Sequence, residues 1–134
     1  MVELVNSGMI KFGEDISLFQ EQLEKPKDEE KFVRYLYTKP RRMLFMGYRA
    51  EIAAMGFCND KLCAVKMRFG STYEDFEHLR NRITNLYARP VKSKKSFSMK
   101  ETVTWRYSGI EIILMFHPSK LYTDVSLSHL ALQK

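Results

Sequence analysis

The chain has 134 residues, of which 45% are hydrophobic and 28% are charged. This balance argues against wholesale disorder and predicts one domain over residues 1–134. No apolar run approaches the roughly 20 residues that cross a bilayer, and residues 1–9 lack the basic and apolar regions of a signal peptide. We therefore expect no transmembrane segment and no signal peptide in residues 1–9, although a protein whose leader has been removed would show the same pattern.

The formal net charge of +6 is unevenly distributed. Residues 1–30 contain eight acids and three lysines, so this segment carries −5 and the remainder carries +11. Two segments, 31–49 and 88–100, contain no acid and hold half of all lysines and arginines. They are either solvated strand ends and loops or a surface for an anionic partner.

The first expected elements are a short N-terminal helix and a group of strands. Ile16, Phe19 and Leu23 fall on one side of a short helix, and a polar connector is expected at 24–31. Gly47 predicts a bulge or bend within the strand region. Alternation of apolar and polar residues places strands at 32–38, 43–49, 51–58 and 61–69.

The clearest signal is a capped amphipathic stretch over 71–87. Ser71 and Glu74 stand at the spacing of a capping box, in which each side chain satisfies a free backbone N–H group at the start of a helix. The stretch therefore predicts a long helix that packs one apolar stripe on a sheet. The members of the stripe are Phe76, Leu79, Ile83, Leu86 and Tyr87.

A basic loop is expected at 88–100, followed by strands at 102–107, 110–117 and 121–132. The predicted fold class is α+β: an antiparallel sheet of about six strands, one long helix packed on one face and the short N-terminal helix. The succession of hairpin, capped helix and tryptophan-containing strand resembles small bacterial α+β domains of unknown function over most of residues 50–116. This resemblance implies no activity and no site.

Cys58 and Cys63 flank a polar turn. A turn centred on Asp60-Lys61, or a four-residue loop, would place them opposite each other at a spacing that a disulfide accepts. A turn at Asn59-Asp60 would instead pair Cys58 with Lys61 and leave no bridge. The alternative is two reduced thiols. Bonded cysteines would indicate a periplasmic or secreted protein in a processed form, whereas reduced ones would indicate a cytoplasmic protein.

No catalytic or cofactor motif is present. The histidines lie far apart in the sequence and form no metal-ligand spacing, and two cysteines without a nearby histidine pair cannot fill a zinc shell. Gly70-Ser71-Thr72 lacks the lysine and the glycines of a phosphate-binding loop. We therefore expect no cofactor, no metal and no catalytic residue. A small enzyme whose site assembles only in space is the third hypothesis.

The leading hypothesis is a non-enzymatic binding domain that contacts an unknown protein partner through a surface or a sheet edge. The alternative is binding of nucleic acid or another polyanion through segments 31–49 and 88–100. Convergence of these segments would give binding with strong salt dependence, whereas separate segments would serve solubility. The expected contacts are exposed basic residues near the prolines: Arg41, Arg42, Lys92, Lys94 and Lys95.

Overall fold

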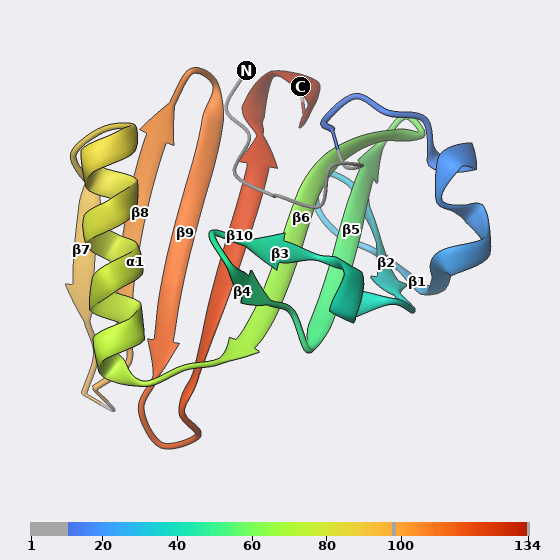
Figure 1. The fold of residues 1–134 in the computed structure, drawn as a ribbon. Helices are drawn as coiled ribbons and strands as arrows, with labels where there is room; N and C mark the ends of the chain where they lie inside the picture. Colours follow the sequence, from blue (N-terminus) through green and yellow to red (C-terminus); the bar gives the residue numbers. More distant parts are fainter. Residues whose placement is uncertain (1–10, 98, 134) are drawn as a thin grey trace.

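The computed structural model describes residues 11–97 and 99–133. Their main feature is an eight-stranded antiparallel sheet with the order β1-β2-β5-β6-β10-β9-β8-β7 (Figure 1). A separate two-stranded hairpin consists of β3 (Leu44–Phe45) and β4 (Tyr48–Arg49). The strands of the large sheet are β1 (Leu23–Asp28), β2 (Val33–Tyr37), β5 (Ile52–Cys58), β6 (Lys61–Gly70), β7 (Lys92–Lys95), β8 (Glu101–Tyr107), β9 (Ile110–His117) and β10 (Tyr122–His129).

One α-helix, α1 (Tyr73–Leu86), connects β6 to β7 and lies across β8 and β9 (Figure 1). Its capping box consists of Thr72 and Asp75, each of which accepts a hydrogen bond from the backbone N–H of the other. The box therefore lies one residue later than the predicted pair of Ser71 and Glu74. The reason is that the Ser71 hydroxyl is buried and accepts a hydrogen bond from Thr123 Oγ1 at 2.8 Å, which ties Ser71 to β10.

The apolar stripe of α1 is confirmed for Phe76, Leu79 and Ile83, which are fully buried. The prediction is wrong for Leu86, whose side chain is 59% exposed. The helix ends at this residue, and Tyr87 instead contacts the sheet, with its ring centroid 5.5 Å from that of Tyr107.

The core lies between the sheet and a second layer that consists of α1 and the β3–β4 hairpin (Figure 1). Tyr48 of β4 connects the hairpin to both the sheet and the helix. Its ring stacks on Phe69 of β6, and its hydroxyl donates a hydrogen bond to Asp75 of α1 at 3.0 Å. The largest fully buried side chains include Trp105, Phe45, Phe69, Phe76, Met43, Met55, Leu62 and Met67.

The predicted fold class of an α+β domain with about six strands and a short N-terminal helix is wrong. The structure is mostly β, with ten strands and a single α-helix among the described residues. The N-terminal helix is replaced by two short 3₁₀-helices, η1 (Ile16–Leu18) and η2 (Gln20–Gln22). Residues 43–49 form the small hairpin rather than one strand of the sheet.

The predicted connector at 24–31 and the predicted basic loop at 88–100 hold the two edge strands, β1 and β7. An edge strand pairs on one side only, and all four residues of β7 are exposed. Such a strand needs no alternation of apolar and polar residues, and lysines at an edge oppose pairing with other chains. The pattern that identified the inner strands was therefore missing at both edges.

Candidate functional site

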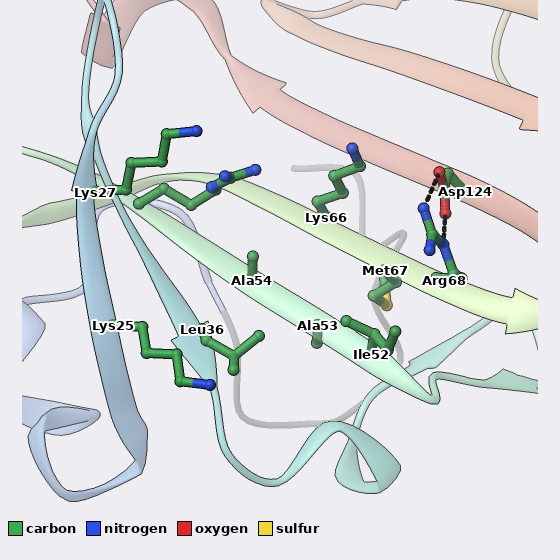
Figure 2. A pocket seen from close by; sticks show the side chains of 11 residues that line it. Lys25, Lys27, Leu36, Ile52, Ala53, Ala54, Lys66, Met67, Arg68 and Asp124 are labelled. Carbon is green, nitrogen blue, oxygen red and sulfur yellow. Dashed lines mark hydrogen bonds and ion pairs between the residues drawn. The ribbon is translucent and has the colours of Figure 1, made fainter.

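The face of the sheet opposite α1 carries a groove, and we call this face the open face. The groove has two adjoining hollows, of about 340 Å³ and about 280 Å³. Arg34, Ala54 and Lys66 line both. β1, β2, β5, β6 and β10 supply the walls and the floor (Figure 2).

Small side chains make the floor of the groove. Ala54, Gly56 and Ala64 lie on the open face, where Gly56 pairs with Ala64 across β5 and β6. A Cβ atom on Gly56 would lie only 2.5 Å from a ring carbon of Phe32. The absence of a side chain therefore lets the Phe32 ring lie directly on the sheet and border one hollow.

Five cationic side chains surround this floor: Lys25, Lys27, Arg34, Lys66 and Arg68. The first two come from the edge strand β1, where the register slips between Glu24 and Lys27. Lys25 has a φ of +53° at this bulge. A bulge changes the direction of the side chains around it, and both lysines line the groove (Figure 2).

The cations fall into two groups. Arg34 is 3.3 Å from Glu29, and Arg68 donates two hydrogen bonds to Asp124, at 2.7 and 3.2 Å. Lys25, Lys27 and Lys66 form no ion pair with any residue that the structure describes, and Lys66 is exposed. The groove thus keeps an excess of positive charge that no neighbouring acid neutralises.

Buried Asp124 also connects Arg68 to a histidine. His117 Nε2 lies 3.2 Å from Asp124 Oδ2, and the Arg68 guanidinium lies 3.9 Å from the centroid of the Tyr122 ring. Burial lowers the pKa of His117, although Asp124 opposes this shift, so the ring is neutral at pH 7. The hydrogen bond to Asp124 raises the pKa of Arg68. The network holds the Arg68 side chain in place at one end of the groove.

A histidine beside an aspartate is also a common general-base pair. In the described ranges, however, the only side chain within hydrogen-bonding distance of His117 is that of Asp124, so no serine or cysteine nucleophile is aligned with it. Nor do these ranges contain a group of three or more side chains suited to hold a metal ion.

The basic residues predicted as partner contacts are exposed, as expected. Arg41 and Arg42 lie in η3 (Pro40–Arg42), which contacts β4 and β5. Lys92, Lys94 and Lys95 lie on β7 at the far edge, with β6, β10, β9 and β8 between them and β5 (Figure 1). The structure therefore does not bring the two basic segments together.

Sequence reasoning missed the lysines of the groove. Lys66 and Arg68 alternate with the buried Val65 and Met67 along the strand expected at 61–69, so they lie on the face opposite the core. Nothing in the sequence indicated that Lys25 and Lys27 would lie on the same face, because β1 was not expected to be a strand.

Cys58 and Cys63 form a disulfide with their Cα atoms 5.9 Å apart. The turn is at Asn59-Asp60 and Cys58 does pair with Lys61, so the expectation that this turn would exclude a bridge is wrong. The register shifts between Gly56 and Phe57, and Cys63 is the extra residue of the resulting bulge. The bulge brings Cys63 within bonding reach of Cys58.

No protein-family model, curated protein or solved structure matches this chain. The function is therefore argued from the geometry of the molecule. None of the helices in the described ranges is long and apolar enough to cross a membrane.

Proposed function

We propose that this protein is a non-enzymatic binding domain that receives an acidic segment of a protein partner in the groove of its open face. The observation that carries the proposal is a set of three lysines, Lys25, Lys27 and Lys66, that form no ion pair among the described residues and lie around a floor of small side chains. Their charge complements carboxylates, which would gain partners without displacing an existing ion pair.

The floor suggests the shape of the partner segment. Leu36, Ile52 and Ala54 offer apolar surface between the lysines. An extended strand points successive side chains in opposite directions, so alternating apolar and acidic residues could place small apolar side chains on the floor. The carboxylates would then reach the lysines at the rim.

Fluorescence anisotropy with a labelled peptide of alternating glutamate and leucine tests the proposal. We expect binding that weakens as salt is added, because the groove charges are exposed and are screened over about 8 Å at physiological ionic strength. A peptide with lysine in place of glutamate should not bind.

A matched pair of triple variants locates the site. Lys25→Gln, Lys27→Gln and Lys66→Gln together should weaken peptide binding by about tenfold or more, since each close charge pair contributes up to roughly 1 kcal/mol. Lys92→Gln, Lys94→Gln and Lys95→Gln remove the same charge from β7 and should change binding little. Equal losses in the two variants would refute the groove as the site.

Nucleic acid is the competing ligand for a basic surface. A parallel titration with single-stranded and duplex DNA at low salt compares the two ligands directly, because phosphate binding is strongest at low salt. Tighter, groove-dependent binding of DNA than of the acidic peptide would replace the protein partner with a polyanion.

The disulfide supports a proposed location as well. We propose that the protein works in an oxidising compartment, either the periplasm or outside the cell, since disulfides persist there and are rare in the cytosol. Blocking of free thiols in freshly lysed cells, followed by mass measurement, tests this. Recovery of both cysteines as blocked thiols would support the cytoplasm instead.

A further inference from the structure

Three apolar side chains project from turns of the sheet rather than packing in the core. Phe97 is fully exposed, with a relative accessibility of 108%, and Met99 is 55% exposed. Both belong to the turn between β7 and β8. Leu121, in the turn between β9 and β10, is 57% exposed. Isolated apolar side chains are common on surfaces, but an apolar group at one end of a molecule indicates an interaction site.

The two turns leave the sheet at the same end, as the register shows. Lys95 pairs with Glu101, Glu101 pairs with Phe116, and Phe116 pairs with Thr123, in one row across four strands. Both turns lie just beyond this row, at the lower end of the sheet in Figure 1.

The turn that carries Phe97 is closed by backbone hydrogen bonds. The Ser96 N–H donates to the Lys100 carbonyl at 2.9 Å, and the Met99 N–H donates to the Ser96 carbonyl at 2.9 Å. These bonds link Ser96 to Met99 and Lys100, beside the two exposed apolar side chains.

Positive charge surrounds the apolar tips. Lys94, Lys100 and Lys120 form no ion pair within the described part of the chain. The nearby Glu101 is buried and already accepts hydrogen bonds from Tyr73 and Arg80. Glu74, in the first turn of α1, and Glu51, next to Gly70, are exposed acids near this end in the described part of the chain.

We propose that this end of the sheet docks on the surface of an anionic lipid bilayer. Phe97, Met99 and Leu121 would enter the boundary between headgroups and acyl chains, while the three unpaired lysines contact anionic headgroups. Single protruding side chains suit a soft bilayer better than a protein partner, whose specific interfaces are broad and shape-complementary. Lysines suit this position because they can bury their methylene stems and keep the ammonium group at the headgroups.

Sedimentation of the full chain with vesicles tests the proposal. We expect binding to vesicles that contain phosphatidylserine and little binding to pure phosphatidylcholine. Phe97→Ser should weaken binding by about tenfold or more, as expected for a phenylalanine that leaves water. The exposed Leu18, in η1, provides the control, because Leu18→Ser should change binding little. A thermal melt of each variant verifies folding.

Further variants test how deeply Phe97 enters the bilayer and whether the lysines provide the attraction to anionic lipid. Phe97→Trp should give a tryptophan signal that brominated lipids quench, whereas Leu18→Trp should not. Lys94→Gln, Lys100→Gln and Lys120→Gln together should abolish the preference for anionic vesicles, because each lysine near the surface raises the affinity roughly fivefold.

Absence of binding to anionic vesicles, or binding that Phe97→Ser leaves unchanged, would overturn the proposal. The groove variant lacking Lys25, Lys27 and Lys66 should retain vesicle binding, so the two proposals can fail separately.

Discussion

The two faces of the sheet are built from the same strands but have different chemistry. On β6, Val65, Met67 and Phe69 point into the core, while Lys66 and Arg68 point to the open face. Successive residues of a strand face opposite sides, so one segment supplies both surfaces. The covered face is close-packed and apolar, whereas the open face combines small side chains with charge. The comparison indicates that stability resides on the covered face and leaves the open face available for binding.

The largest effect is expected in the covered layer. Leu79→Ala should lower the free energy of unfolding by about 2–5 kcal/mol, because it removes a fully buried side chain and leaves a cavity. Leu86→Ala on the same helix is the control and should change stability by less than about 0.5 kcal/mol. Urea unfolding measures both. A similar small loss for the two variants would contradict the described packing of α1.

The second prediction concerns the close approach of the Phe32 ring to Gly56 on the open face. Gly56→Val should destabilise the protein by about 1–3 kcal/mol, because the new side chain overlaps the Phe32 ring. Adding Phe32→Ala should reduce this penalty. Equilibrium unfolding of the two single variants and the double variant gives the coupling energy. Purely additive effects would show that the ring does not lie over Gly56 in solution.

A smaller effect is expected from the disulfide. Cys58→Ser with Cys63→Ser should cost about 1–2 kcal/mol, because the loop is short and a 15-residue loop corresponds to about 3 kcal/mol. The measurement compares denaturation midpoints of the oxidised protein, the reduced protein and the variant. A reduced protein as stable as the oxidised one would mean that the bridge does not constrain the unfolded chain.

The smallest expected effect is a dependence on pH that arises at the open face. The pKa of His117 is lowered on folding, so the unfolded chain binds the proton first as the pH falls below about 6.5. The stabilising effect of neutral His117 is present above that pH and is lost as the pH falls through its folded pKa. His117→Gln should therefore weaken the decline in stability on mild acidification.

The sequence predicted the inner strands because burial leaves a pattern in them. Ile110, Ile112 and Leu114 alternate along β9, and all three are buried. β1 and β7 have no such pattern, since an edge strand carries little of the core. The strand order was not predictable from local periodicity, because it depends on packing between distant segments. For example, β6 pairs with β10, although α1, β7, β8 and β9 lie between them in the sequence.

The groove was hidden for the same reason. Lys27 and Lys66 are far apart in the sequence and become neighbours only through the pairing of β1, β2, β5 and β6. The disulfide required a bulge that the spacing of Cys58 and Cys63 did not indicate. The exposure of Arg41 and Lys94 was predictable from their charge and from the nearby prolines. That the two residues lie at distant parts of the sheet was not predictable, because it depends on the strand order.

The two edge strands determine how this protein can meet other molecules. β1 carries Pro26, which has no N–H to donate, and a bulge interrupts its register. β7 consists of Lys92, Ser93, Lys94 and Lys95, so a second copy brought alongside would oppose like charges. Neither edge is a good template for another strand, and the sheet resists growth into fibrils. Both edges therefore disfavour recognition by addition of a further strand.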